Sequence, residues 1–505
     1  MRAAVALALL LLGSSAWAQA PVFTQAIVIG ANNSVDHELA PLRYADDDAI
    51  RFAELFDAIG IPTRVLTRLD EPTSRLHPGA AARALVPTDA QLRAVVAEVA
   101  ALMAQARARG QKTALYLVFA GHGNARRGSA YLTLEDARLS AEDLLRGVVE
   151  PIGAHRAHVI IDACHSYLFA MSRGPGGTHR PVQGFLEESF RGRAEQVGFL
   201  ISSSQSGESH EWEAFQSGVF SHEVRSGLAG AADADGDGIV SYREIAAFVI
   251  RANAAIVNEA YRPTVHARAP RGDDVLVDLR PATGDRLRVD GAAGGKHFLV
   301  EDARGVRWAD FHARAGQPLK VLLPAGHRPL YVRNADDGQE SVVDGPEKEV
   351  VLAERSARPS EAGARGASQH VFRALFTLPF DRHAVDSYEL QMEEDGVVEA
   401  KPWGKRTWLG VAALAAAAGA AAGGTYCLFK ARSLYDSTTS DADQKMAAER
   451  NASIGRYERG TWVLYGTGLA AAAAGAFALF WPSESAAVAV VPHDRGMTVA
   501  LTLRR

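Results

Sequence analysis

Two side chains that could perform nucleophilic chemistry follow apolar runs of the chain. The run TALYLVFA at 113–120 leads into Gly121-His122-Gly123, and the run HVIID at 158–162 leads through Ala163 into Cys164. If both runs are strands of one parallel sheet, their carboxyl ends meet at the same edge, where such sheets carry functional groups. A cysteine thiolate needs a histidine that accepts its proton and later protonates the leaving group. The pattern therefore predicts a dyad of Cys164 and His122.

The backbone beside these two residues could stabilise an oxyanion. Gly123 lacks a Cβ atom, so its N–H can approach a developing negative charge closely, and the N–H of Cys164 offers a second donor. The alternative interpretation is a buried thiol and an ordinary loop histidine, which would be preferred if either residue stood alone. His165 adjoins Cys164, but neighbouring side chains at a strand end point to opposite sides, so we interpret His165 as structural.

A second candidate site is an acidic loop that has the spacing of a twelve-residue EF-hand. Carboxylates alternate along its first half, a glycine allows a sharp turn, and a final glutamate could bind a metal ion through both oxygens. The expected calcium ligands in this loop, 233–244, are Asp233, Asp235, Asp237, Ile239 (through its carbonyl), Ser241 and Glu244. The alternative is an acidic turn that only caps the helix expected from Tyr242. A single loop indicates a structural or activating role for calcium, and no organic cofactor is expected.

The elements that must position these residues alternate in type between about 25 and 260. Short apolar runs are expected to be strands, at 25–30, 113–120, 158–162 and 197–202, and they are continuous, as in strands covered on both faces. Between them, the apolar residues of 49–56 repeat at helical spacing. Thr88 and Gln91 form a potential capping box before a second helix, which should stop at Gly110. This alternation predicts an α/β fold with a mainly parallel sheet.

A different pattern follows at 284–353, where short segments alternate apolar and polar residues between turns that contain Gly and Asp. This pattern predicts a small β-sandwich. Residues 354–369 have the composition of a flexible linker. We therefore expect a first domain at 21–275, a β-sandwich at 280–355 and a linker at 356–406.

The paired motifs resemble a known family. GHG after one apolar strand and DACHS after the next resemble the caspase-like cysteine peptidases, and most closely their metacaspase branch. IVIGANNS and LRYADDDAIRFAELF resemble that family's first strand and helix, and SGVFSHEVRSGL resembles its late helix. The resemblance covers about 25–260 and nothing beyond 280. It implies a caspase-haemoglobinase fold, in which His122 and Cys164 match the catalytic dyad.

The same resemblance places Asp48 and Asp162 in the family's acidic first pocket, which implies cleavage after Arg or Lys. An ionised carboxylate at Asp162, beside the nucleophile, needs a cation or hydrogen-bond donors, and a substrate guanidinium would supply both. A relative that cuts after Asp would need arginines there, and none lies beside either motif. The alternatives are a helix-start carboxylate for Asp48 and a carboxylate bound by backbone N–H groups for Asp162.

The chain also has a candidate leader and two candidate membrane spans. Residues 1–18 combine Arg2, a short apolar run and a small-residue cleavage site, which predicts a secretory signal peptide rather than an uncleaved anchor. The uncharged stretches 407–429 and 461–481 are each long enough to cross a bilayer. Tryptophans lie near their ends, and small residues at four-residue spacing would allow close packing, so we expect a two-helix membrane hairpin. A soluble Ala-rich hairpin is the alternative.

These segments predict a location in a bacterial cell envelope, because the composition is rich in Ala and Arg. The peptidase domain is then expected on the periplasmic side, with 430–460 as a cytoplasmic loop. That loop is richer in Lys and Arg than the outer flanks, in the sense of the positive-inside rule. The tail, 482–505, alternates like a short hairpin.

Composition removes several classes of function. A net charge of −5 argues against a broad nucleic-acid-binding face, and two cysteines cannot form a disulfide framework. The expected partners are protein or peptide substrates and the membrane, with self-processing after Arg191 or Arg193 in a polar segment between two strands. Two classes remain. One is a membrane-anchored cysteine endopeptidase, which the dyad favours. The other is a catalytically silent envelope protein that uses the fold as a calcium-supported binding or scaffolding module.

Overall fold

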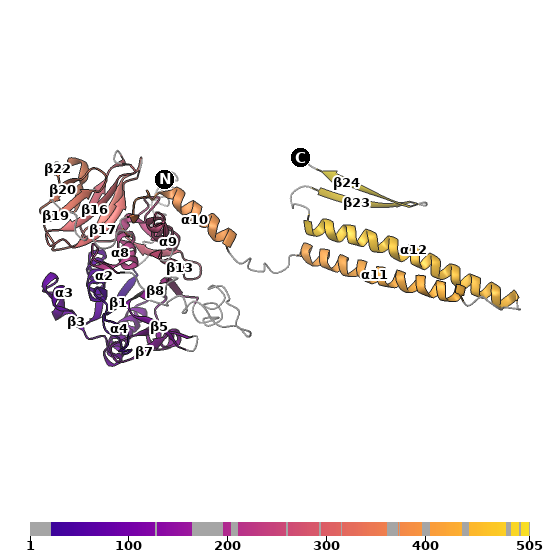
Figure 1. Ribbon diagram of the computed structural model, residues 1–505, viewed down its shortest axis with the longest axis horizontal. Coiled ribbons are helices and arrows are strands. Elements are labelled where there is room, and N and C mark those ends of the chain that lie inside the picture. The colour runs from indigo at the N-terminus through magenta and orange to yellow at the C-terminus, as the bar shows by residue number, and fades with distance from the viewer. Residues whose placement is uncertain are drawn as a thin grey trace, which may run out of the picture. The chain divides into compact units, whose positions relative to one another are not determined.

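The chain divides into two compact units, Met1–Asp395 and Gly396–Arg505, each of which is described by itself. The computed structural model (Figure 1) describes residues 22–126, 129–163, 195–203, 211–258, 261–291, 294–314, 316–360, 372, 374–395, 405–436, 444–480, 486–493 and 496–503. The predicted signal peptide, 1–18, lies outside the described residues.

The first unit is built on a seven-stranded sheet with the strand order β13-β9-β8-β4-β1-β2-β3. Its strands are β1 (Phe23–Ala31), β2 (Thr63–Thr67), β3 (Ala84–Leu85), β4 (Thr113–Gly121), β8 (Arg156–Ala163), β9 (Val197–Ser203) and β13 (Thr264–Arg268). All neighbouring pairs are parallel except β9 and β13. The four predicted strands and the mainly parallel sheet are confirmed, whereas the shorter β2, β3 and β13 were missed.

Helices cover both faces of this sheet. They are α2 (Ala45–Ile59), α3 (Glu71–Leu76), α4 (Asp89–Ala108), α5 (Ala141–Leu144), α6 (Glu150–Ile152), α8 (Val219–Ser226), α9 (Tyr242–Asn253) and α10 (Arg382–Asp395). In β1, Val28 shares a core cluster with Phe52 of α2, whereas the next residue, Ile29, shares another with Val95 of α4. Because successive strand residues face opposite sides, α2 and α4 lie on opposite faces.

Side chains outside the helices fix where α2 and α4 begin. Asn32, which follows β1, accepts the backbone N–H groups of Ala45 and Asp46 at 2.9 and 3.3 Å, and so holds the first turn of α2. Thr88 accepts the N–H of Gln91 at 3.4 Å, which is one half of the predicted capping box. The carboxylates at the start of α2 are thereby anchored near the end of β1.

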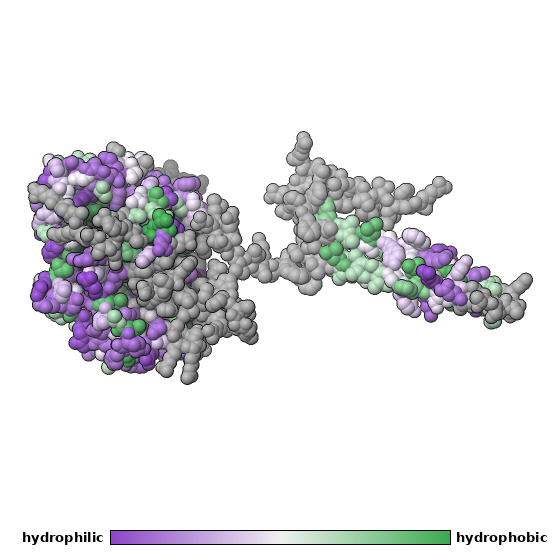
Figure 2. Space-filling model, viewed as in Figure 1, coloured by the Kyte–Doolittle hydropathy of each residue, from purple (hydrophilic) through white to green (hydrophobic). Residues whose placement is uncertain are grey.

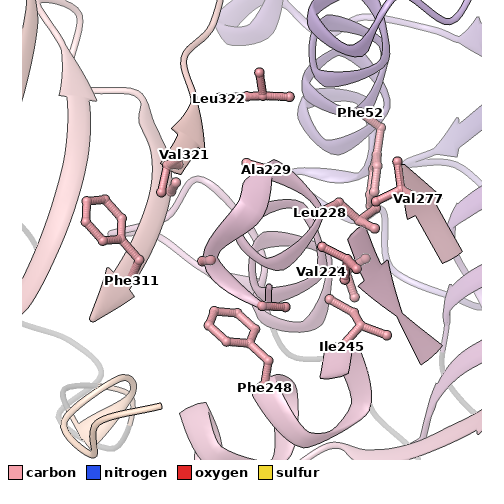
Figure 3. Packing of buried hydrophobic residues seen from close by; sticks show 14 of the residues in the cluster. Phe52, Val224, Leu228, Ala229, Ile245, Phe248, Val277, Phe311, Val321 and Leu322 are labelled. Carbon is pink, nitrogen blue, oxygen red and sulfur yellow. The ribbon is translucent and has the colours of Figure 1, made fainter. Parts of the chain in front are cut away.

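The chain after the main sheet forms a domain of two further sheets, here called the β-domain (286–359). The smaller sheet contains β15 (Arg286–Val289), β18 (Leu319–Leu322) and β21 (Glu349–Val351), and the larger contains β16 (His297–Asp302), β17 (Arg307–His312), β19 (Leu330–Asn334), β20 (Gln339–Val343) and β22 (Ala357–Pro359). The expected β-rich region is therefore present. Phe311 and Val321 belong to the same core cluster as Val224 of α8 and Phe248 of α9 (Figure 3), so the two domains share one core.

Three small sheets complete the first unit. They are β5 (Gly123–Arg126), β6 (Ser129–Thr133) and β7 (Arg138–Ser140); β10 (Glu211–Trp212) and β11 (Ser217–Gly218); and β12 (Ile239–Ser241) and β14 (Val275–Asp278).

The structure corrects the predicted linker, 356–406. β22 and α10 lie within this interval, and Phe372, Phe376 and Phe380 are buried. The N–H of Phe376 donates to the carbonyl of Ala252 in α9 at 3.0 Å. The apolar segment that precedes α10 is short and has no clear period, so composition alone could not distinguish it from a linker.

The second unit contains a helical hairpin of α11 (Lys405–Asp436) and α12 (Gln444–Phe480), followed by a β-hairpin of β23 (Ala486–His493) and β24 (Gly496–Leu503). Small residues let the two helices approach: a Cβ atom built on Gly468 would lie 3.2 Å from the Cβ of Ala420. The hairpin predicted in the tail is present. The predicted loop 430–460 is corrected, because α11 continues to Asp436 and α12 begins at Gln444.

Of the described residues, one segment, Ala412–Asp436, is both long and apolar enough to cross a membrane. It overlaps the predicted span 407–429 and extends further toward the turn. The second predicted span, 461–481, falls largely within α12 and stays a prediction.

The buried contacts of Phe376 give a first testable prediction. Because this side chain is 1% exposed and packs against Phe248 and His297, Phe376→Ala should lower the free energy of unfolding by about 3–5 kcal/mol. Denaturant unfolding of the full chain measures this, with the exposed Arg382→Ala as the matched control. If the two variants were equally stable, the segment around Phe376 would be a linker, as the sequence predicted.

Candidate active site

Parallel pairing of β4 with β8 brings the two candidate catalytic positions to one edge of the sheet. The register pairs Gly121 with Ala163, and these residues immediately precede His122 and Cys164. Cys164 and His165, like the predicted processing sites Arg191 and Arg193, lie outside the described residues. The edge itself is fixed by the last residues of two buried strands.

His122 has the features of a proton acceptor. Its side chain makes a hydrogen bond to the backbone of Ala40, and its Nε2 is buried without a hydrogen-bond partner among the described residues. Burial lowers the pKa of His122, so the imidazole is neutral near pH 7. With Nδ1–H donated to the Ala40 carbonyl, the lone pair stays on Nε2. The backbone carbonyl of His122 accepts the N–H of Thr133 at 3.0 Å, which holds the residue in place.

The N–H of Gly123 is available for an oxyanion. Gly123 pairs with Leu132 across β5 and β6, and the bond from Thr133 N–H to the His122 carbonyl flanks this pair. In an antiparallel ladder such a flanking bond marks a non-hydrogen-bonded pair, whose own N–H groups point away from the partner strand. The predicted oxyanion donor is therefore not used by the β5–β6 ladder.

Asp48 is engaged in a buried ion pair that the sequence did not indicate. Its Oδ1 accepts Arg225 of α8 at 2.6 Å and the hydroxyl of Ser217, and its Oδ2 accepts the N–H of Gly218 at 2.9 Å. Asp48 and Arg225 are 2% and 3% exposed. No arginine lies beside this motif in the sequence, but in the fold Arg225 contacts Asp48. The expectation that the site has no arginine is therefore wrong.

Asp162, at the end of β8, accepts donors from α8 and from β9. Its Oδ2 accepts the backbone N–H and hydroxyl of Ser221 at 3.0 and 2.7 Å, and its Oδ1 accepts the hydroxyl of Ser202 at 3.2 Å. The alternative of a carboxylate bound by backbone N–H is thus partly realised.

Gly218 brings the two predicted pocket residues together. A Cβ atom built on Gly218 would lie 2.6 Å from Oδ2 of Asp162 and 3.2 Å from Oδ2 of Asp48. Both carboxylates therefore face the same small space, which only glycine at this position leaves open.

Sequence reasoning missed a third acid at this place, Glu211. In the short sheet of β10 and β11, Glu211 stands directly opposite Gly218, and its carboxylate accepts the N–H groups of Arg43 and Tyr44 at 2.8–3.1 Å. Burial, together with the charges of Asp48 and Asp162, raises the pKa of Glu211 to about 7. Nothing in the local sequence distinguishes Glu211 from an ordinary surface acid.

The acidic loop at 233–244 folds as its spacing predicts. One carboxylate oxygen from each of Asp233, Asp235 and Asp237 lies within 4.8 Å of the others. Asp233 also accepts the N–H groups of Gly236 and Gly238 at 2.7 and 3.1 Å. The second half of the loop contains β12, which pairs antiparallel with β14.

The helix after the loop is capped by two of the predicted ligands. Ser241 and Glu244 form a capping box at the start of α9, and Glu244 accepts the N–H of Ala234 at 2.9 Å. The alternative role of helix capping is therefore real, and it does not exclude a metal. Burial raises the pKa of Asp233 and of Glu244, which a bound cation would counteract. Arg314 of the β-domain is buried beside these acids, so the loop already has one nearby positive charge.

Comparisons with known proteins agree with the motifs. Residues 24–268 match the family model described as a caspase domain. Residues 24–268 are called the caspase domain below, after this match. Among solved structures, the chain is similar to caspase-1 from Spodoptera frugiperda, with 10% identity and a TM-score of 0.32, over 51% of this chain and 90% of that chain. Comparison with curated proteins gave no match. Residues 24–268 are thus similar to a family of cysteine peptidases, whereas the metacaspase branch stays a prediction.

The buried Asp48–Arg225 pair gives a prediction about stability. Arg225→Met should destabilise the protein by about 3–5 kcal/mol, because it leaves the Asp48 carboxylate buried without its cation. The double variant with Asp48→Asn should recover part of this loss, since no unpaired charge remains. Denaturant unfolding of wild type, both single variants and the double variant measures the coupling; additive losses would contradict a direct interaction.

Proposed function

We propose that this chain is a membrane-anchored cysteine endopeptidase in which Cys164 is the nucleophile and His122 the general base. The observation that supports the proposal best is the pairing of Gly121 with Ala163, which are the residues just before the two reactive ones. Nε2 of His122, at the same edge, has no hydrogen-bond partner among the described residues, which supports the proposal independently.

In the proposed mechanism, Nε2 of His122 removes the proton of the Cys164 thiol, and the sulfur attacks the scissile carbonyl carbon. The N–H groups of Gly123 and Cys164 stabilise the oxyanion of the tetrahedral intermediate. The C–N bond then breaks, and His122 gives its proton to the leaving amine. A water molecule hydrolyses the acyl-enzyme after losing a proton to His122, which restores the thiol.

Replacement of either dyad residue tests this chemistry. Cys164→Ala and His122→Ala should each lower kcat by at least about 1,000-fold, because neither residue can act without the other. Cys427→Ala, at the other cysteine of the chain, is the matched control and should leave turnover unchanged. A thiol-reactive peptidyl probe should label the wild type and not Cys164→Ala. Substantial activity in either dyad variant, or a wild type that is neither active nor labelled, would favour the scaffolding alternative.

We propose further that the peptidase cleaves after Arg or Lys. Three acids, Asp48, Asp162 and Glu211, lie around Gly218. Asp162 is also only two residues before Cys164 in the sequence. The pKa of Glu211 is raised mainly by burial and, to a smaller extent, by the negative charges of Asp48 and Asp162. Because Asp48 is already paired with Arg225, we assign it mainly to positioning and assign contact with the substrate cation to Asp162 and Glu211.

Matched fluorogenic peptides that differ only at the cleaved residue test this specificity. Arg peptides should react faster than Leu or Asp peptides, and Asp162→Asn should lower kcat/KM for Arg peptides about 10- to 100-fold. The Arg-to-Leu ratio of kcat/KM should rise with pH through about 7, because Glu211 gains its charge there. Titration of the dyad affects both peptides equally and therefore leaves this ratio unchanged. In Glu211→Gln the ratio should no longer depend on pH. Equal rates for all peptides would contradict the pocket.

We also propose that the loop 233–244 binds calcium and supports the caspase domain. The converging oxygens of Asp233, Asp235 and Asp237 and the pairing of β12 with β14 support this role. In this proposal Ile239 contributes its carbonyl, Ser241 a side-chain or water-mediated contact, and Glu244 both carboxylate oxygens.

Calcium titration of the melting temperature tests the loop. Added calcium should raise Tm of the wild type, and Glu244→Lys should abolish the shift, because it replaces a ligand with a cation. Glu244 also caps α9, so the exposed Asp235→Asn serves as a second variant that spares the cap. If the wild type ignores calcium, or both variants respond like the wild type, the loop is only a turn.

Membrane anchoring rests on the surface of the helical hairpin. Trp462, Val463 and Leu469 of α12 are 77%, 63% and 75% exposed, and apolar residues of both helices form a continuous band (Figure 2). Large exposed apolar surfaces of this kind suit lipid rather than water. With the predicted leader, this supports an envelope protein whose caspase domain is exported.

A further inference from the structure

A cavity of about 290 Å³ lies between the caspase domain and the β-domain, away from the candidate active site. Ile50 of α2, Val65 of β2 and Pro78 form its apolar walls. Glu54, His77 and, from the β-domain, His327 supply its polar groups. A space of this size can hold a small organic molecule.

The hydrogen bonds of Glu54 determine which atoms of the cavity carry protons. Its Oε1 lies 3.3 Å from Nδ1 of His77 and 3.1 Å from Nε2 of His327. Burial alone would raise the pKa of Glu54, but these two hydrogen bonds hold it at about 2. Glu54 is therefore ionised and can only accept, so Nδ1 of His77 must donate. Burial lowers the pKa of His77, which keeps the ring neutral and leaves a lone pair on its Nε2.

Two acceptors of the cavity are consequently left unmet. Nε2 of His77 and Oε2 of Glu54 are buried and have no hydrogen-bond partner within the described part of the chain. His77 is 3% exposed, and its Nε2 lies 4.0 Å from Oδ1 of Asp47, which is beyond hydrogen-bond distance. Arg83, which also lines the cavity, donates to both oxygens of Asp57 at 2.8 and 3.3 Å. Both unmet atoms among the lining residues are thus acceptors, and leaving them without a donor is unfavourable.

We propose that this cavity binds a small aliphatic cation, an alkylammonium or alkylguanidinium ion. Its N–H groups would donate to Oε2 of Glu54 and Nε2 of His77, and its hydrocarbon part would pack on Ile50, Val65 and Pro78. Apolar walls favour such an ion over a hydrated metal, and the histidine nitrogens that face Glu54 carry protons and cannot ligate a metal there. The ligand would contact both domains, since His327 comes from the β-domain.

Calorimetric titration of the full chain in detergent with agmatine and with hexylamine tests this site. Both should bind, the neutral 1-hexanol should not, and Glu54→Gln should weaken binding at least about 10-fold, because it removes the charge. Ala80→Phe is a second variant, since Ala80 lines the cavity and a ring there would fill it without changing charge. It should also abolish binding, which keeps the test valid if Glu54→Gln does not fold.

The proposed substrate pocket also attracts cations, so Asp162→Asn is the matched control and should retain this binding. Loss of binding in Asp162→Asn but not in Glu54→Gln would assign the cation to the substrate pocket and overturn the proposal. Binding that neither cavity variant weakens, or equal binding of 1-hexanol, would overturn it as well. Binding of N-acetylarginine amide without binding of agmatine would assign the cavity to a protein side chain instead of a free cation. None of these outcomes depends on whether the peptidase proposal holds.

Discussion

The buried ion pair between Asp48 and Arg225 is the interaction on which the candidate active site depends. Asp48 stands in the first turn of α2 and Arg225 in the last turn of α8, so the pair fixes the distance between these helices. Arg225 also donates to the hydroxyl of Ser217 at 2.9 Å, which holds β11 between them. A buried carboxylate is costly without a counter-ion, and breaking such a pair is costlier still. The positions of the groups around Gly218 therefore depend on the ion pair between Asp48 and Arg225.

α8 connects the candidate active site to the β-domain through buried polar contacts. All eight of its residues are buried although most are polar, and each polar side chain has a specific partner. Ser221 binds Asp162, Arg225 binds Asp48, and His222 donates from Nε2 to Asp310 of β17 at 2.7 Å. Asp310 in turn donates its N–H to the hydroxyl of Ser226 at 3.1 Å. The β-domain is thus part of the framework that positions the pocket, and not an appended module.

Sequence alone predicted what local patterns encode. The runs before His122 and Ala163 are long, continuous and apolar, so the strands and their shared edge followed directly, as did the loop around Asp233 from its spacing. Contacts between segments that are far apart in the sequence could not be predicted. Arg225 and Glu211 look like ordinary surface charges in the sequence, and only the fold places Arg225 beside Asp48 and Glu211 opposite Gly218. Phe376 was missed for the same reason, since its burial is set by α9 and not by its neighbours.

A buried polar atom without a hydrogen-bond partner indicates a functional site only when its surroundings also do. Oε2 of Glu223 has no partner among the described residues, yet burial raises the pKa of Glu223 well above its usual range, so that carboxyl is protonated and neutral, held by Asn253. Nε2 of His122 differs because it stands at the strand edge that leads to Cys164, and Nε2 of His77 differs because it lines a cavity. In both, a lone pair is fixed by a hydrogen bond on the opposite ring nitrogen. That arrangement prepares His122 to accept a proton from a thiol and His77 to accept a hydrogen bond from a cation.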